Sequence, residues 1–124
     1  MDIPKIPEAE YRFCLILWEL EAVKSTELVR ICRERLGWKD TTTYTVIKRL
    51  SQRGVLINEN TVVRSLVSKD QVQASELNDL VEKTFEGSLP SFVAAFTKHQ
   101  KLSDREIDQL QAMIDSYRKG NGNG

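Results

Sequence analysis

Hydrophobic and polar positions follow the helical period over three successive segments of the N-terminal half. Residues 8–20 are apolar on most of their circumference, so the pattern predicts a helix that is covered on several sides. Residues 25–35 repeat apolar side chains at four-residue spacing and stop before Gly37, a residue type that commonly ends helices. Together these segments predict a small helical core.

The third predicted helix, residues 41–53 with Asp40 as a candidate cap, has two different faces. One face carries the apolar-spaced Thr43, Val46, Ile47 and Leu50. The opposite face has hydrogen-bonding and cationic side chains, and no carboxylate occurs between Asp40 and Glu59. A helix lying in the major groove of DNA presents such side chains. The candidate DNA-contacting residues are therefore Thr41, Thr42, Tyr44, Thr45, Lys48 and Arg49.

Different roles are expected along this face. Thr41, Tyr44 and Thr45 are expected near base edges, which carry sequence information. Lys48 and Arg49 are expected nearer phosphates. Arg12, Lys24 and Ser25 are secondary candidates for backbone contacts.

After Gly54 the pattern changes to β-branched runs at residues 55–57 and 61–67, separated by a turn-forming cluster at 58–60. These runs predict a β-hairpin. Three helices followed by a hairpin are the element order of a winged helix, with the second and third helices as the helix-turn-helix pair. Arg64 on the hairpin is expected to contact the DNA backbone.

From residue 68 onward the pattern is helical again. Ser68 and Gln71 form a capping-box pattern that opens a helix to about residue 86, and a short helix follows around Phe92. A second capping box, Ser103 with Glu106, opens a last helix with one apolar stripe. The stripe consists of Ile107, Leu110, Met113, Ile114 and Tyr117.

About fifty residues of short helices bury too little apolar surface to be stable alone. They either fold back on the N-terminal domain or pair with a second copy of the chain. Pairing is favoured, because one winged helix reads only a few base pairs and dimers read two half-sites. The stripe on the last helix is therefore the predicted dimer interface.

The predicted fold class is mainly α with a small β-hairpin. Residues 1–67 are expected to form a winged-helix DNA-binding domain, residues 68–119 a helical dimerisation segment, and residues 120–124 a disordered tail.

Composition and charge refine this prediction. Hydrophobic residues make up 40% of the chain and charged residues 29%, which is typical of a folded domain. No apolar run is long enough to span a bilayer, and the N-terminal residues lack a signal-peptide pattern, so a cytoplasmic protein is expected. The net charge is zero, but residues 24–64 contain nine Lys or Arg against four Asp or Glu. A locally basic N-terminal half suits a nucleic-acid reader.

Reactive chemistry is not indicated. Cys14 and Cys32 fit small reduced core residues, and His99 is the only histidine, so no metal site or cofactor is expected. No residues pair a nucleophile with a base, which argues against an enzyme.

Several motifs in order resemble the penicillinase-repressor family of bacterial regulators over residues 6–119. The matching segments are residues 6–11 and 16–18, Gly37-Trp38, Thr42, Thr45, residues 48–50, Gly54, residues 66–70 and residues 91–96. The resemblance implies an autonomous dimeric repressor that binds a short inverted-repeat operator in double-stranded DNA.

In one branch of that family, a membrane sensor protease triggers cleavage of a bond that precedes a phenylalanine. This bond maps onto Ala95–Phe96, where that branch has asparagine in place of Ala95, and implies a possible regulatory protease as a partner. A copper-sensing branch has a cysteine-rich C-terminus, which this chain lacks. Tyr44 stands where many members have a basic residue, so the family's operator sequence does not transfer.

Two functions remain open at this point. The first is the DNA-binding repressor, and the second is a winged-helix module that docks a protein through the same face without binding DNA. The carboxylate-free face favours DNA, since a protein-docking face has no reason to exclude negative charge.

Overall fold

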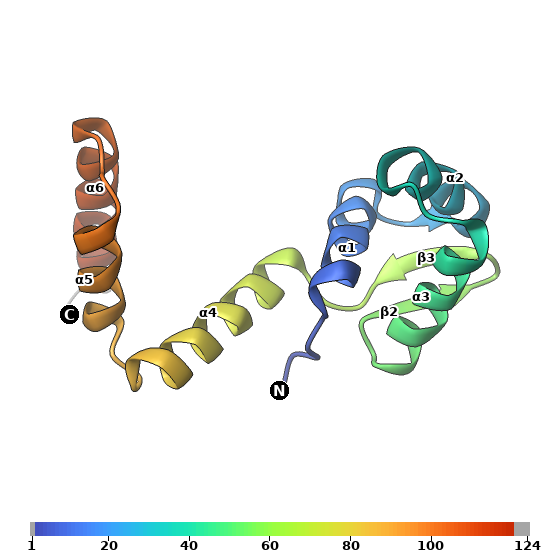
Figure 1. The fold of residues 1–124 in the computed structure, drawn as a ribbon, viewed down its shortest axis with the longest axis horizontal. Coiled ribbons are helices and arrows are strands. Elements are labelled where there is room, and N and C mark those ends of the chain that lie inside the picture. The colour runs from blue at the N-terminus through green and yellow to red at the C-terminus, as the bar shows by residue number, and fades with distance from the viewer. Residues whose placement is uncertain (1, 121–124) are drawn as a thin grey trace. The chain divides into compact units, whose positions relative to one another are not determined.

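The structure, a computed structural model, describes residues 2–120 and divides into two compact units that meet after Asp79. Figure 1 shows the order of the elements. The elements of the first unit are α1 (Glu8–Leu20), β1 (Val23–Lys24), α2 (Ser25–Leu36), α3 (Asp40–Gln52), β2 (Leu56–Glu59) and β3 (Val62–Ser65), followed by the start of α4 (Lys69–Phe85). Three helices followed by a wing hairpin confirm the predicted winged helix-turn-helix.

The wing belongs to a three-stranded antiparallel sheet with the order β1-β3-β2. β1 was missed by the sequence analysis, because a two-residue strand is too short to show alternation. The hairpin turn was predicted at residues 58–60, one to two residues too early. Asn58 and Glu59 pair with Val63 and Val62, and the turn falls on Asn60 and Thr61, whose φ angles are 51° and 63°. Two successive left-handed residues match the turn type that suits the twist of a two-residue hairpin.

The core of the first unit lies where α1, α2, α3 and the sheet meet. Phe13, Leu28 and Leu50 are completely buried in it, one from each helix, and Val63 joins them from β3. Phe13 stacks on Trp38 with ring centroids 6.0 Å apart and planes 4° from parallel. This stack connects α1 to the segment that leads into α3.

The first unit extends further than the predicted domain of residues 1–67. Val72 on α4 is buried in the same core cluster, and Lys5 Nζ lies 3.7 Å from the Asp79 carboxylate. The first turns of α4 therefore pack with the winged helix. The functional division into a DNA-binding domain and a dimerisation segment stays a prediction.

The second unit contains the end of α4, α5 (Leu89–His99) and α6 (Asp104–Gly120). Phe85 and Phe92 meet edge to face, with centroids 5.5 Å apart. Neither α5 nor α6 contains a buried residue. Gly120 is the last residue of α6, so the tail predicted from residue 120 is wrong at that residue. The rest of it, residues 121–124, lies outside the described residues.

Both predicted capping boxes are confirmed. At the start of α4 the Gln71 amide donates to Ser68 Oγ at 3.0 Å, and the Ser68 amide donates to Gln71 Oε1 at 2.9 Å. Before α6 the Glu106 amide donates to Ser103 Oγ at 3.1 Å, and the Ser103 amide donates to Glu106 Oε1 at 3.0 Å. These reciprocal bonds satisfy amides that a helix start otherwise leaves without acceptors.

Among residues 2–120, no helix is long and apolar enough to cross a membrane.

We expect both cysteines to be unreactive in the folded protein. Burial, followed by the nearby Glu10 charge, raises the pKa of the Cys14 thiol to about 12, and burial raises the pKa of Cys32 to about 11. Because the thiolate is the nucleophile, a disulfide reagent at pH 8 should label the native protein very slowly and the urea-unfolded protein rapidly. Rapid labelling of either thiol before unfolding would contradict this burial.

The two capping boxes should differ in their response to acid. Hydrogen bonds from the Ser103 amide and hydroxyl lower the pKa of Glu106, so its stabilisation is complete above the ordinary pKa of about 4.3 and is lost as the pH falls through the lowered value. Glu106→Gln keeps an acceptor, as Gln71 does at α4, and should remove this pH dependence. Titration of the Glu106 carboxyl by NMR checks the sign; a midpoint at or above about 4.3 would contradict it.

Candidate nucleic-acid interface

The two faces of α3 are as the sequence predicts. Thr43, Val46, Ile47 and Leu50 are buried against the core. The residues on the opposite side are exposed, namely Thr41, Thr42, Tyr44, Thr45, Lys48 and Arg49. The Thr45 hydroxyl donates to the Thr41 carbonyl at 2.8 Å, which leaves its methyl group and its acceptor capacity for a ligand. The helix therefore presents hydroxyl, phenol, methyl and cationic groups along one exposed strip.

A fork-shaped ion pair connects the two helices of the helix-turn-helix. Arg33 Nη2 on α2 lies 2.8 Å from both carboxylate oxygens of Asp40, and Arg33 Nε lies 3.0 Å from one of them. Asp40 was predicted as the cap of α3, but Lys39 holds that position without a side-chain cap bond. Arg33 binds the Asp40 carboxylate instead, which helps to fix α3 relative to α2.

Most arginines of the basic N-terminal half have an acidic partner within the molecule. Arg30 pairs with Glu27 and Glu34, and Arg35 pairs with Glu19 on α1. Within the part of the chain that the structure describes, the basic side chains of residues 12–53 with no ion-pair partner are Arg12, Lys24, Lys39, Lys48 and Arg53. Basic side chains without an acidic partner are thus fewer than the count of Lys and Arg in the sequence suggests. Lys39, which precedes α3, was not singled out by sequence reasoning.

Arg64 lies on β3 of the wing and is exposed. Its Nη2 is 3.3 Å from Glu59 on β2, and both side chains are solvent-exposed. An exposed pair of this kind contributes little stability, so its partners exchange readily. Arg64 therefore stays available to an anionic ligand.

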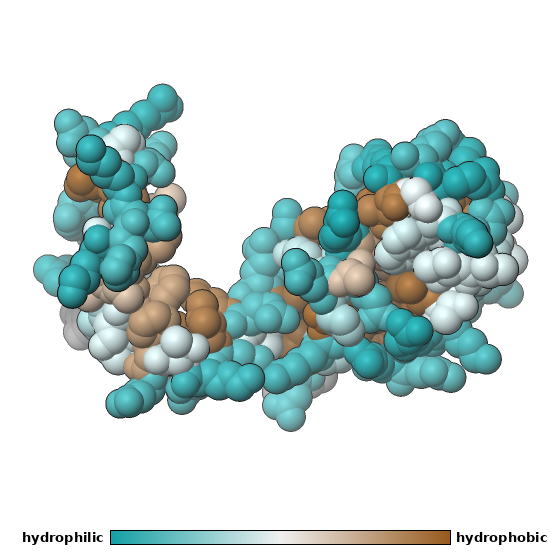
Figure 2. All heavy atoms as spheres, viewed as in Figure 1, coloured by the Kyte–Doolittle hydropathy of each residue, from teal (hydrophilic) through white to brown (hydrophobic). Residues whose placement is uncertain are grey.

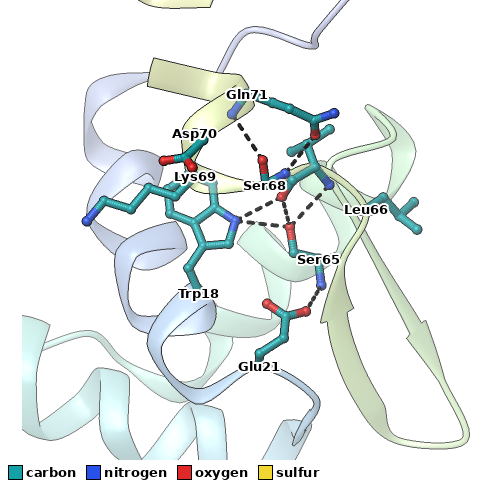
Figure 3. Close-up of a pocket in the computed structure, with 9 residues that line it drawn as sticks. Trp18, Glu21, Ser65, Leu66, Ser68, Lys69, Asp70 and Gln71 are labelled. Carbon is teal, nitrogen blue, oxygen red and sulfur yellow. Dashed lines mark hydrogen bonds between the residues drawn. The ribbon is translucent and has the colours of Figure 1, made fainter. Parts of the chain in front are cut away.

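The base of the wing is tied to α1 by a hydrogen-bond network beside an open pocket (Figure 3). The Trp18 indole nitrogen donates to Ser65 Oγ and to the Val67 carbonyl, both at 3.0 Å. Glu21 accepts from the Ser65 amide at 2.9 Å. These bonds give the indole nitrogen of the half-buried Trp18 polar partners at the end of β3.

Arg49 is engaged by a carboxylate that sequence reasoning did not connect with it. Its Nη1 lies 2.6 Å from Oε1 of Glu10 on α1. The two residues are far apart in the sequence, and only packing of α1 on α3 brings them together.

The stripe predicted as a dimer interface is exposed on α6. Its five members, 44–73% exposed, are Ile107, Leu110, Met113, Ile114 and Tyr117. A largely apolar groove between α5 and α6 includes Ile107, Leu110 and Ile114 together with Val93 of α5. Figure 2 shows hydrophobic residues of this unit, in brown and tan, at the molecular surface. A role of this surface in dimerisation stays a prediction.

The bond between Ala95 and Phe96 lies inside α5, with Ala95 half-buried and Phe96 exposed. A protease needs an extended substrate, so cleavage there would require α5 to open locally. Processing at this bond stays a prediction.

No group of metal-ligating residues occurs among those that the structure describes.

Comparison with known proteins agrees with the resemblance seen in the sequence. A family model described as penicillinase repressor matches residues 6–116. The penicillinase repressor of Bacillus licheniformis is 23% identical over 121 residues, which cover 94% of each chain. The methicillin resistance regulatory protein MecI of Staphylococcus aureus is 24% identical over 115 residues, which cover 90% of this chain and 94% of MecI.

Among solved structures, the crystal structure of the transcriptional regulator SlyA aligns with a TM-score of 0.39 and 19% identity, covering 91% of this chain and 74% of that chain. The family model extends over most of the sequence, from the residues before α1 into α6. The chain therefore belongs to the penicillinase repressor family.

Proposed function

We propose that this protein is a transcriptional repressor that binds duplex DNA as a homodimer, with α3 of each subunit in the major groove of one operator half-site. The observation that carries the proposal is the exposed, carboxylate-free face of α3 behind the first turn of the helix. Thr41, Tyr44 and Thr45 on this face can meet base edges, and Lys48 can meet a phosphate. The similar proteins include a penicillinase repressor and a methicillin resistance regulatory protein, which supports the same function.

The wing supplies a second contact in this proposal. Arg64 exchanges its exposed partner Glu59 for a backbone phosphate beside the half-site. The short hairpin, with its turn at Asn60 and Thr61, limits the wing to backbone contacts rather than base reading.

Dimerisation is supported by the apolar side chains of α6. Ile114 and Tyr117 are 58% and 73% exposed, although each would release free energy on leaving water. A second copy of the same unit offers an equivalent apolar stripe, and a two-fold dimer matches an inverted repeat. An inverted-repeat operator is therefore part of the proposal.

The proposal predicts that duplexes selected from a random pool contain an inverted repeat, and that their affinity falls steeply with salt. Lys48→Gln should flatten the slope of log affinity against log salt by about 0.9, the value for one lost phosphate contact. Lys83→Gln, an exposed lysine on α4, serves as the matched control and should leave the slope unchanged. Failure to enrich any duplex would remove DNA binding and leave the protein-docking module as the alternative.

Dimerisation has its own test in sedimentation measurements. Ile114→Asp places a charge in the apolar stripe, and we expect it to convert a dimer into a monomer and to lose at least about tenfold in operator affinity. Ala112→Asp adds the same charge on the opposite side of α6 and should stay dimeric. A monomeric unmodified protein would refute the dimer, whatever the outcome for DNA.

A further inference from the structure

Glu10 differs from every other acidic residue that pairs with an arginine in this protein. Its side chain is only 4% exposed, whereas the partners of Arg30, Arg33, Arg35 and Arg64 are 47–62% exposed. Of the buried residues within the described part of the chain, Glu10 is the one with an ionisable carboxylate. A buried carboxylate is costly unless it is paired. Its placement therefore requires an explanation that a surface pair does not.

Stability alone explains this placement poorly. Oε1 binds Arg49, but Oε2 is buried and has no hydrogen-bond partner among the described residues. The position of Glu10 in the first turn of α1 offsets part of the cost, because the helix dipole favours negative charge there. An apolar side chain would nevertheless fill the same space at lower cost, since replacing buried ion pairs is often neutral or stabilising.

The geometry of Arg49 indicates what the buried carboxylate does. Arg49 follows Lys48 on α3, and its side chain is 49% exposed although one of its nitrogens is held by Glu10. Nη1 makes the contact with Glu10, and no hydrogen bond within residues 2–120 uses Nε or Nη2. A guanidinium is a rigid planar fork, so a bond at Nη1 restricts the directions in which the donors on Nε and Nη2 can point.

We propose that Glu10 is a positioning residue for DNA recognition: it holds Nη1 of Arg49 so that the remaining donors of the guanidinium are aimed at one backbone phosphate. This inference rests on the proposed function, because the phosphate belongs to the operator. In this arrangement α1 contributes to DNA binding without touching DNA. Prior orientation of Arg49 avoids part of the side-chain ordering that binding otherwise requires.

The test measures affinity and salt slope on a duplex selected by the unmodified protein, with four single variants and one double variant. Arg49→Gln should weaken binding about tenfold and flatten the salt slope by about 0.9. Glu10→Gln, which keeps size and shape, should weaken binding about threefold to tenfold. In the Arg49→Gln background the same Glu10→Gln change should have no further effect, because Glu10 acts through Arg49.

Two further variants separate positioning from folding. Glu19→Gln removes the exposed partner of Arg35 from the same helix, and should leave DNA affinity unchanged. Arg49→Lys keeps the positive charge but has no planar fork, so it should keep the salt slope while binding weakens. Arg49→Lys also tests the proposal if Glu10→Gln fails to fold.

Each of the following results would overturn the proposal. Tighter binding by Glu10→Gln would mean that Glu10 competes with phosphate for Arg49. An effect of Glu10→Gln that persists in the Arg49→Gln background would mean that Glu10 acts through the fold. Unchanged binding by Glu10→Gln, while the unmodified protein binds the duplex, would reject this inference and leave the proposed function intact. Absence of binding by the unmodified protein would reject both.

Discussion

Phe13 stacks on Trp38 with nearly parallel rings, and this contact constrains the direction in which α3 leaves the core. Trp38 lies just before α3, directly after Gly37 ends α2 in the left-handed conformation. A shift of the ring would move the whole helix that follows it. Because interiors are close-packed, the fully buried Phe13 leaves little room for such a shift.

Two polar contacts act on the same helix at different points. The Arg33–Asp40 fork holds its first turn against α2, and the Glu10–Arg49 pair holds its last turns against α1. An aromatic stack, an exposed fork and an ion pair with one buried partner thus restrain one rigid element at three points. In the proposed function α3 reads base edges, which requires a fixed helix direction, and these contacts would supply that restraint.

Sequence patterns predicted the elements well where a periodic pattern extends over many residues. They failed where an element is only two residues long or depends on pairing with residues distant in the sequence. The helices of α1, α2 and α3 follow from apolar spacing, and the starts of α4 and α6 follow from Ser68 and Ser103 with their partners. β1 and the position of the hairpin turn did not follow, because a two-residue strand has no period. The register of the hairpin also depends on pairing across the sheet.

The candidate site shows the same division. The exposed face of α3 could be predicted, because helical geometry alone decides which side chains share a face. Which arginines form ion pairs could not be predicted, because each pairing depends on which acidic residue the fold brings near. Counting charges gives Arg30, Arg35 and Lys48 equal weight, whereas in the structure the first two are paired and Lys48 has no ion-pair partner within the described residues.

The apolar surface is distributed unequally between the two units, and this gives a physical reason for assembly. Within residues 2–120, nine of the thirteen large apolar side chains that are exposed lie in the second unit, although that unit is the smaller one. Val81 is its one buried hydrophobic residue among those described. In the proposed dimer, a helical unit with so little core would gain stability from the surface that the second copy covers. Operator affinity and the order of α6 would then depend on the same association, so a change that loosens α5 or α6 would weaken DNA binding without touching α3.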